Sequence, residues 1–424
     1  MAKPQEIEEI EEKVILVGVS EQEGDDAEDS VTELAELVKT AGATVVGALI
    51  QKRETIHPGT YVGTGKVEEI AQLIAQTGAT GIVCDDELSP AQLRNLESML
   101  DTKVMDRTLI ILDIFAARAT TSEGKIQVEL AQLKYRLSRL SGLGKTMSRL
   151  GGGIGTRGPG EKKLEIDRRL INDRIAQLNR ELKEVVKHRE ITRAKRAKSE
   201  VPVVAIVGYT NAGKSTTMNG LLRACGKDDD KQVFEKDMLF ATLDTSVRRL
   251  HFKDNKDFLI SDTVGFVSHL PHQLVQAFKS TLSEAAKADL LVQVIDVSDP
   301  NYRDMIKTTE ETLKEIGVEN IPMIYAFNKA DLTEAPYPEI LGNQITYSAK
   351  DPASIEKIVE LIKENIFKDD RIVTFKIPFS EGRYLDELNV RGTVLETTYE
   401  EDGTVVSANV SPELHSRLSR FETH

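Results

Sequence analysis

The chain lacks several features that would assign it to an exported or membrane class. It has only two cysteines, Cys84 and Cys225, so it has no disulfide framework, and a reducing cytoplasm is the expected compartment. The leader at residues 1–13 is acidic, which excludes a signal peptide there. The longest apolar run, around 290–297, is far shorter than the ~20 residues that a membrane helix needs. We therefore expect a cytoplasmic protein without a membrane segment.

The chain also lacks an excess of positive charge. Its 424 residues carry a formal net charge of −14, which by itself argues against a nucleic-acid partner. This average hides one segment, however. Residues 118–198 contain 21 Lys and Arg against 9 Asp and Glu, a balance of +12, which leaves −26 on the remainder. Such asymmetry is typical of a segment that faces a polyanion.

The most informative stretch is residues 208–215, which read Gly-Tyr-Thr-Asn-Ala-Gly-Lys-Ser. This is the phosphate-loop pattern, and the apolar run before it and the helical pattern after it give the expected context. The Lys214 ammonium should approach the β- and γ-phosphates, and the Ser215 hydroxyl can ligate Mg²⁺. The residues of the loop expected to contact nucleotide are Gly208, Tyr209, Thr210, Asn211, Ala212, Gly213, Lys214, Ser215 and Thr216.

Two further segments have the pattern of nucleotide sensors. Residues 240–244 read Phe-Ala-Thr-Leu-Asp and place Thr242 where a magnesium-sensing threonine is expected. Residues 262–265 read Asp-Thr-Val-Gly at a strand end, so that Asp262 can hold Mg²⁺ through water and the Gly265 N–H can bond the γ-phosphate. We predict that Lys214, Thr242 and Gly265 serve catalysis and that Ser215, Thr242 and Asp262 serve the metal. The nucleotide-contacting residues predicted here are Phe240, Ala241, Thr242, Asp262, Thr263, Val264 and Gly265.

A glutamine is absent where many small GTPases use one to orient the attacking water, because Phe266 follows Gly265. A phenylalanine ring cannot orient water. Either hydrolysis is slow alone and depends on a group that a partner supplies, or Phe266 merely packs and another residue of the chain positions the water. The sequence leaves both interpretations open.

The base is expected to be read by residues 328–331, Asn-Lys-Ala-Asp, which follow a buried apolar run. A carboxylate at Asp331 can accept hydrogen bonds from the N1–H and 2-amino groups of guanine, whereas adenine leaves it unpaired. We expect a preference for guanine on the order of 10³-fold. A later loop can reach the guanine carbonyl through backbone N–H groups. The predicted base-site residues are Asn328, Lys329, Asp331, Ser348, Ala349 and Lys350.

Hydrophobic periodicity divides the chain into five parts. We predict an acidic leader at 1–13, an N-terminal α/β domain at 14–117, a basic helical hairpin at 118–198, a phosphate-loop GTPase domain of α/β class at 199–369, and a small α+β domain at 370–424. Within the first domain, residues 61–66 (Tyr-Val-Gly-Thr-Gly-Lys) look like half a phosphate loop. A turn that caps the next helix is the preferred interpretation, and phosphate or RNA contact is the alternative.

The basic hairpin is predicted from apolar residues at steps of three and four, which are typical of a two-helix coiled-coil seam. They are Ile126, Leu130, Leu133, Leu137 and Leu140 in one helix, and Leu164, Ile171, Ile175, Leu178, Leu182 and Val185 in the other. Residues 142–160 between them are glycine-rich, and we expect them to be non-helical because each glycine costs roughly 1 kcal/mol relative to alanine.

The tip of this hairpin carries the cations Lys145, Arg149 and Arg157. It has almost no large apolar side chains to bury and can approach a phosphate backbone closely. Structured RNA is the favoured ligand; an acidic protein groove and a plain solvent-exposed tip are the alternatives.

The nucleotide motifs at 208–216, 240–244, 262–266 and 328–331 resemble those of the Obg–HflX superfamily of translational GTPases. Residues 106–115 (Asp-Arg-Thr-Leu-Ile-Ile-Leu-Asp-Ile-Phe) and the glycine-rich residues 151–161 resemble the HflX family itself. The resemblance implies GTP and GDP as ligands with Mg²⁺. It also implies binding to the large ribosomal subunit and its rRNA, with the hairpin directed toward the peptidyl-transferase centre.

The resemblance further implies that the protein splits or rescues stalled ribosomes. A ribosome-assembly GTPase that acts on large-subunit precursors and a non-ribosomal scaffold switched by GTP remain alternatives. Asn211 also occurs in potassium-stimulated GTPases, so K⁺ near Asn211 is an expectation, against an asparagine that only stabilises its own loop. A monomer is expected.

Overall fold

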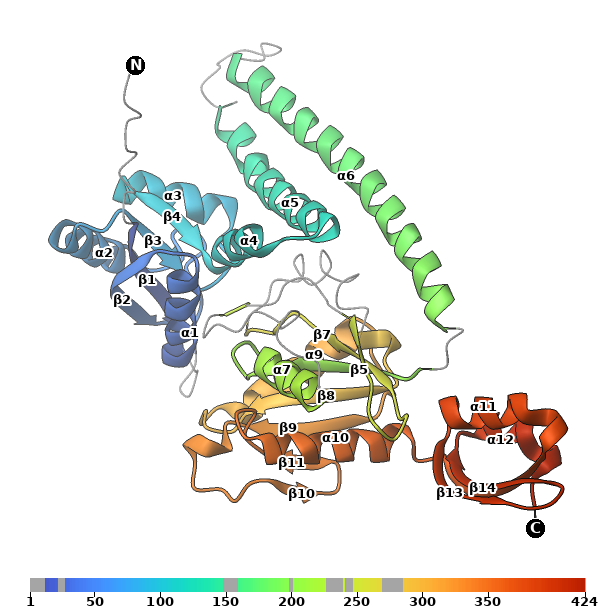
Figure 1. Cartoon of the computed structure of the whole chain (residues 1–424). Coiled ribbons are helices and arrows are strands. Elements are labelled where there is room, and N and C mark those ends of the chain that lie inside the picture. The colour runs from blue at the N-terminus through green and yellow to red at the C-terminus, as the bar shows by residue number, and fades with distance from the viewer. Residues whose placement is uncertain are drawn as a thin grey trace, which may run out of the picture. The chain divides into compact units, whose positions relative to one another are not determined.

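The computed structural model describes residues 12–21, 27–147, 159–197, 201–225, 239–240, 247–268 and 285–423, and within the long helices it leaves out the side chains of 141–147, 159–164 and 188–197. The chain divides into two compact units, and each is described here by itself (Figure 1). Unit 1 comprises Met1–Ile191, Lys236–Asp244 and Val267–Ser280. Unit 2 comprises Thr192–Glu235, Thr245–Phe266 and Thr281–His424.

Unit 1 begins with a four-stranded parallel sheet of order β2-β1-β3-β4. Its strands are β1 (Lys13–Ser20), β2 (Thr44–Lys52), β3 (Gly81–Cys84) and β4 (Lys103–Asp106), and they alternate with α1 (Ala27–Thr40), α2 (Thr64–Thr77), α3 (Pro90–Leu100) and α4 (Arg107–Arg118). The central strands β1 and β3 are buried almost throughout, which explains their unbroken apolar sequences. This arrangement confirms the predicted α/β class.

Local sequence signals set the helix boundaries in this unit. The Ser89 hydroxyl oxygen accepts a hydrogen bond from the Gln92 backbone N–H, and the Gln92 side-chain oxygen accepts one from the Ser89 backbone N–H. The predicted N-cap of α3 is therefore a complete capping box. Gly63 is the N-cap of α2, and the following Lys66 pairs with Glu69. Residues 61–66 therefore form the turn that starts a helix, as the preferred interpretation expected.

A buried pair of residues at the junction of β4 and α4 was not anticipated. Asp106 is fully buried and accepts from the Leu88 N–H at 3.1 Å, the Leu109 N–H at 2.9 Å and the Tyr135 hydroxyl at 2.7 Å, and it also pairs with Arg139. Because Tyr135 and Arg139 lie in the middle of the next helix, Asp106 holds that helix against the end of β4.

Arg107 is only 1% exposed and lies among acceptors. Its guanidinium donates to Asp85 at 2.7 Å, to Glu33 at 3.0 Å and to the Ser30 carbonyl at 2.8 Å. It also donates to the Ser268 carbonyl at 3.1 Å, within the same unit. Burial alone would lower the pKa of this guanidinium, but its two carboxylate partners raise it.

The basic hairpin consists of α5 (Ser122–Met147) and α6 (Pro159–Ala197). A two-pronged ion pair joins the two helices, since Arg174 donates to both carboxylate oxygens of Glu129 at 2.8 and 3.0 Å. Leu178, predicted in the seam, is fully buried. The prediction that 142–160 is non-helical is wrong at both ends, because α5 continues through Met147 and α6 already begins at Pro159. Proline is favoured in a first helical turn, and a helix already anchored by earlier turns tolerates the roughly 1 kcal/mol of each glycine.

Unit 2 is built on a seven-stranded sheet of order β10-β11-β9-β8-β5-β7-β6, in which only β6 and β10 run antiparallel to their neighbours. The strands are β5 (Val203–Gly208), β6 (Val247–Leu250), β7 (Phe258–Asp262), β8 (Leu290–Asp296), β9 (Met323–Asn328), β10 (Glu339–Leu341) and β11 (Gln344–Thr346). Helices α7 (Lys214–Ala224), α9 (Tyr302–Glu315) and α10 (Pro352–Ile366) and the short helices η2 (Ala285–Lys287) and η3 (Ala330–Leu332) complete the domain.

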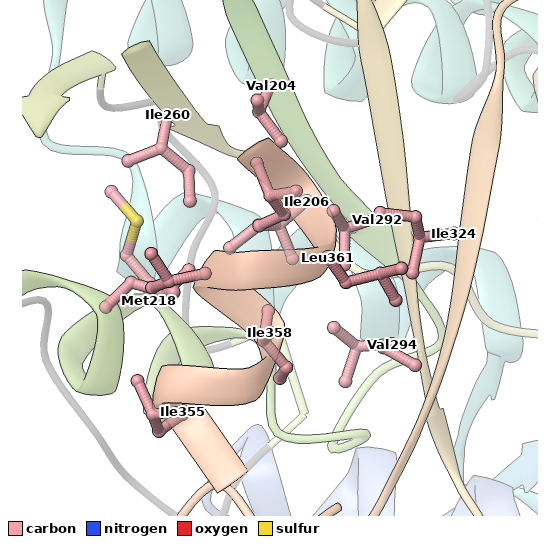
Figure 2. Close-up of a cluster of buried hydrophobic side chains, with 14 of the residues drawn as sticks. Val204, Ile206, Met218, Ile260, Val292, Val294, Ile324, Ile355, Ile358 and Leu361 are labelled. Carbon is pink, nitrogen blue, oxygen red and sulfur yellow. The ribbon is translucent and has the colours of Figure 1, made fainter. Parts of the chain in front are cut away.

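The core of this domain lies between the sheet and helices α7 and α10. Figure 2 shows Val204 and Ile206 of β5 facing Ile358 and Leu361 of α10, with Met218 of α7 beside them. Each of these side chains is at most 3% exposed. Burying such side chains contributes about 1.5–3 kcal/mol each, so this core holds the carboxyl ends of the strands in register.

The C-terminal module confirms the predicted α+β class. A three-stranded antiparallel sheet of order β12-β14-β13 carries two helices on one face (Figure 1). Its elements are β12 (Arg371–Pro378), η4 (Phe379–Glu381), α11 (Gly382–Arg391), β13 (Thr393–Tyr399), β14 (Gly403–Val410), α12 (Pro412–Leu418) and η5 (Ser419–Phe421). Phe375, Val406 and Leu414 are at most 2% exposed in its core. Across the described ranges of both units, no helix combines the length and apolarity that a bilayer crossing requires.

The buried cation of unit 1 gives a stability prediction. Arg107→Met removes the charge that compensates Asp85 and Glu33, and breaking one side of a buried ion pair costs roughly 3–5 kcal/mol. We expect the free energy of unfolding of unit 1 to fall by about that amount in urea titrations followed by circular dichroism. Lys39→Met, at a 77% exposed side chain of α1, is the control and should change it by less than about 1 kcal/mol. Equal effects of the two substitutions would contradict a structural role for Arg107.

Candidate nucleotide site

The predicted phosphate loop connects β5 to α7 in a conformation that requires its glycines. Gly208 has φ 142°, and a Cβ there would lie 2.2 Å from the Val294 carbonyl oxygen. Gly213 has φ 93°, and a Cβ there would lie 2.1 Å from the Asn328 amide nitrogen. Both positions combine a left-handed backbone with a backbone or side-chain atom in contact, so only glycine fits. The chain thereby turns sharply into the N-terminus of α7, where anions are favoured.

Lys214 is 7% exposed and is held by its own loop. Its ammonium donates to the Gly208 carbonyl at 3.0 Å and to the Tyr209 carbonyl at 2.6 Å. Burial lowers the pKa of Lys214 to about 8, and the negative charge of Asp262 opposes this shift. A phosphate oxygen in the loop would supply a negative partner in place of the neutral carbonyl oxygens that the buried ammonium now contacts.

Asp262 and Gly265 lie beside the loop at the end of β7. Asp262 is fully buried, and the Ser215 hydroxyl donates to it at 3.4 Å. A Cβ on Gly265 would lie 2.9 Å from the Lys214 ammonium nitrogen, so the backbone of Gly265 lies close to that charge. A hydroxyl and a carboxylate at this distance are oxygen ligands of the kind that Mg²⁺ takes together with phosphate oxygens. The structure thus brings together the predicted catalytic and metal residues Lys214, Ser215, Asp262 and Gly265.

Phe266 joins the same loop through its backbone. Its N–H donates to the Gly208 carbonyl at 3.2 Å, and its carbonyl accepts from the Thr210 N–H at 2.7 Å. The Phe266 side chain is 1% exposed and packs in the interior. The residue therefore clamps the sensing segment to the phosphate loop, and its ring is not available to a water in the site.

The base-binding segments are linked to the phosphate loop by Asn328 at the end of β9. The Asn328 amide donates to the Ala212 carbonyl at 2.8 Å, and its oxygen accepts from the Ala349 N–H at 2.9 Å. The side chain is 2% exposed. One asparagine thus connects three separate segments of the chain, so the spacing between the phosphate and base subsites is fixed.

Asp331 lies next to the loop predicted to reach the guanine carbonyl. The Ser348 hydroxyl donates to Asp331 at 2.7 Å, and the exposed ammonium of Lys350 lies 3.6 Å from its other oxygen. Lys329 adopts φ 63° and pairs with Asp296 at 2.6 Å. Because these contacts fix the direction of the carboxylate, the predicted base-site residues form one constellation in unit 2.

Three family models match consecutive parts of the chain. They are described as "GTP-binding GTPase N-terminal" at residues 28–116, "GTP-binding GTPase Middle Region" at 118–196 and "50S ribosome-binding GTPase" at 203–329. A GTPase HflX of Lacrimispora saccharolytica is 51% identical over 420 residues, covering 98% of this chain and 97% of the relative. Similar proteins named GTPase HflX occur in Caldanaerobacter subterraneus, at 46% identity with 97% and 94% coverage, and in Escherichia coli, at 41% identity with 93% and 92% coverage.

The chain belongs to the HflX family of GTPases. It binds GTP and GDP and hydrolyses GTP, as the GTPase models and relatives agree with the constellation above. For this HflX family member, the predicted guanine-nucleotide residues that lie on β5, α7, β7 and β9 and in the loops that follow them belong to unit 2.

One contributor to this pocket was missed in the sequence. Tyr347 is fully buried, and its hydroxyl lies 2.7 Å from the Thr217 hydroxyl of α7, which in turn donates to the Gly213 carbonyl. Burial raises the pKa of the Tyr347 hydroxyl, so it stays neutral. A tyrosine directly after the short strand β11 is not a recognisable signal, and only its contact with Thr217 of α7 reveals its role.

The remaining predicted site residues are either outside the described part of the chain or, for Phe240, pack in unit 1. Ala241 and Thr242 lie outside the described residues, as do Arg149 and Arg157 and the side chain of Lys145. Phe240 is described: it has φ 53°, is 2% exposed and packs edge-on against Phe115 of α4, with ring centroids 4.7 Å apart. Both phenylalanines belong to unit 1, so the side chain of Phe240 serves packing there.

The position of Asn328 predicts a specific loss of binding. Asn328→Ala deletes two buried hydrogen bonds and leaves the Ala212 carbonyl and the Ala349 N–H without that partner, at about 1–3 kcal/mol for each group. GTP and GDP affinity should both fall at least about tenfold in titrations with a fluorescent guanine nucleotide. The control Asn343→Ala removes an exposed amide whose bond to Met323 is 3.5 Å long and should bind normally. Unchanged affinity in Asn328→Ala would contradict its bridging role.

Proposed function

We propose that this GTPase binds the large ribosomal subunit and splits or rescues stalled ribosomes, with the bound nucleotide setting its affinity for the ribosome. The observation that carries the proposal is the attachment of a +12 helical arm to an otherwise acidic guanine-nucleotide protein. A polyanionic partner explains this distribution of charge. The "50S ribosome-binding GTPase" model matching residues 203–329 supports the large subunit as that partner.

The geometry of the arm supports a reaching role. Helix α6 has 39 residues, which corresponds to about 58 Å at 1.5 Å per residue. The Glu129–Arg174 pair braces the two helices, and Asp106 holds the middle of α5 through Tyr135 and Arg139. An arm braced in this way can present its far end to a distant site. We propose that Lys145, Arg149 and Arg157 contact rRNA at that end.

The chemistry proposed for hydrolysis follows from the pocket. Backbone N–H groups of the loop and the Lys214 ammonium would stabilise the charge that develops on the γ-phosphate, and the Gly265 N–H would report its loss. Mg²⁺ held by Ser215, Asp262 and Thr242 would neutralise part of the phosphate charge. Because Phe266 is buried and cannot orient water, we propose that hydrolysis is slow in the isolated protein and is stimulated by the ribosome.

We also propose that K⁺ binds near Asn211. Asn211 is exposed at φ 58° in the loop, and within the described ranges its side chain makes no hydrogen bond that would hold the loop. This favours an external ligand over self-stabilisation. Replacing K⁺ by Na⁺ should lower the rate of GTP hydrolysis by about tenfold in the wild type, as for loss of one charge-stabilising group. Asn211→Ala should show little difference between the two salts at equal ionic strength. A wild-type rate that is the same in both salts would exclude the K⁺ site.

The tip provides the test of ribosome binding. Arg149→Ala combined with Arg157→Ala should weaken sedimentation with isolated large subunits, and the slope of log affinity against log salt should fall by about two, one unit for each lost phosphate contact. The assay is run with GTP, GDP and a non-hydrolysable analogue, on large subunits and on intact ribosomes. The proposed function requires that the affinity depend on the nucleotide and that the GTP state dissociate stalled ribosomes.

The control for the tip variant loses the same charge from α6, away from the tip. Arg168 and Arg169 are both exposed on α6, so replacing both by alanine removes two cations without touching the tip. Nucleotide affinity should be normal in both double variants. If the Arg168 and Arg169 variant loses as much large-subunit binding as the tip variant, the arm binds through its overall positive charge and not through specific contacts at the tip. If neither loses any, the tip has no such role.

A further inference from the structure

The three-stranded sheet of the C-terminal module has two edge strands, β12 and β13, on either side of β14. An edge strand presents a row of N–H and C=O groups to which another strand can pair. Proteins usually block such edges with a covering segment, proline or lysine. The two edges of this sheet differ in this respect.

The edge of β12 is closed by the chain itself. Phe375 forms an antiparallel bridge with Glu422, and the Thr423 N–H donates to the Thr374 carbonyl at 3.0 Å. The Thr423 hydroxyl donates to the same carbonyl at 3.1 Å. The segment after α12 therefore returns to this strand and covers the middle of its outer edge, at Thr374 and Phe375.

The edge of β13 is open over the described residues of the chain. The strand has seven residues, and the last five are exposed. It contains neither proline nor lysine, and its one irregularity is a shift of register between Val394 and Glu396. Two large apolar side chains project from it into solvent, Leu395 at 56% exposure and Tyr399 at 75%. From Glu396 to Tyr399 the pairing with β14 is regular, so the free edge is long enough to take a further strand.

The charge of this edge selects its occupant. Residues 392–416 contain no Lys or Arg, whereas Glu396, Glu400, Glu401 and Asp402 follow one another along the edge and its turn. Lys376 of β12 pairs with Glu400 and Asp402 at 2.8 Å each, which leaves Glu396 and Glu401 outside that pairing. An RNA backbone would be repelled by these carboxylates, and a cationic peptide would be attracted.

The start of β13 is also tied to the nucleotide domain within unit 2. The Asn255 amide, in the turn between β6 and β7, donates to the carbonyls of Asn389 at 2.9 Å and Gly392 at 3.2 Å. The Thr393 hydroxyl donates to the Asp254 carbonyl of the same turn. Strand β7 continues from this turn to Asp262. A partner on β13 would therefore be attached to the strand that carries a nucleotide-site carboxylate.

We propose that β13 binds an extended, Lys- or Arg-containing segment of a partner protein as a fourth strand of the C-terminal sheet. Backbone hydrogen bonds along Glu396–Tyr399 supply the pairing, Leu395 and Tyr399 supply apolar contact, and the carboxylates select cationic side chains. This docking surface goes beyond the proposed function, since it recognises protein through a different domain from the arm that is proposed to bind rRNA.

The first test uses defined peptides with the full-length protein. A fluorescein-labelled peptide of alternating Lys and Val should bind, as measured by fluorescence anisotropy, about tenfold more tightly than the same peptide N-methylated at every backbone nitrogen, which has the same charge. The reason is that a methylated backbone nitrogen cannot donate a hydrogen bond. Amide hydrogen exchange of residues 396–399 should slow when the Lys-Val peptide is bound. Equal affinity for the two peptides would show that the peptide binds by charge attraction alone, and it would overturn the proposal that it adds as a strand.

The second test asks whether the peptide binds at the edge of β13. Glu396→Lys should weaken binding of the Lys-Val peptide at least about fivefold, because it puts like charge on the edge and adds a protecting lysine. The control Glu413→Lys makes the same change of charge on α12 and should bind within about twofold of the wild type. If both variants weaken binding equally, β13 is not the site. If labelled oligouridylate binds the wild type and displaces the Lys-Val peptide, a protein partner is wrong.

Sedimentation with large subunits separates this inference from the proposed function. The Arg149 and Arg157 tip variant should lose large-subunit binding and keep the peptide, whereas Glu396→Lys should lose the peptide and keep GTP binding. A tip variant that sediments normally would contradict the proposed function alone, and a Glu396→Lys variant that still binds the Lys-Val peptide normally would contradict the β13 inference alone.

Discussion

The pocket depends on the contact between the phosphate loop and the end of β9. Gly213 and the Asn328 amide lie so close that no side chain could stand between them, and Asn328 also holds the Ala349 N–H. The predicted phosphate and base subsites are thereby both held by one buried side chain. Because the core beneath it, built from β5, β8, β9, α7 and α10, holds these strand ends in register, the distance between the two subsites needs no ligand to set it.

The same loop is also where a change of nucleotide would be felt. The backbone of Phe266 bonds to both Gly208 and Thr210, and the Gly265 backbone lies beside the Lys214 ammonium. A γ-phosphate entering this space must displace the carbonyl partners of Lys214 and meet the Gly265 N–H directly. The segment that follows Asp262 cannot move without disturbing these bonds. The proposed sensing would therefore act through these shared backbone hydrogen bonds, whereas the buried side chain of Phe266 packs in the interior.

Two adjacent residues in unit 1 hold helix α5 of the arm and Ser268, which follows the predicted sensing segment. Asp106 holds Tyr135 and Arg139 of α5, and Arg107 holds the carbonyl of Ser268, two residues beyond Phe266. Since both residues are buried and fully engaged with other groups, neither can change partners cheaply. Helix α5 of the arm is thus held at a junction of β4 and α4 that also binds Ser268, a residue beyond the predicted sensing segment, all within one unit.

The sequence by itself determined the local features. Glycine at 208 and 213, lysine at 214, the Ser89 cap and the heptad steps of the arm each act within a few residues, and the structure shows the corresponding loop, helix start and buried Leu178. Where the local rule failed, at the glycines within α5, anchoring by distant residues outweighed the intrinsic cost.

The tertiary structure alone decided which distant residues meet. Nothing near Tyr347, Asp106 or Arg107 in the chain indicates their distant side-chain partners. Those partners are Thr217, Tyr135 and Asp85, which lie 22 or more residues away and are brought there by the fold. The open edge of β13 likewise exists only because the segment after α12 returns to β12 and not to β13. Local structure depends on residues that are neighbours in the sequence and can be predicted from them. Contacts between distant residues depend on how the elements pack, which the sequence specifies only through the whole fold.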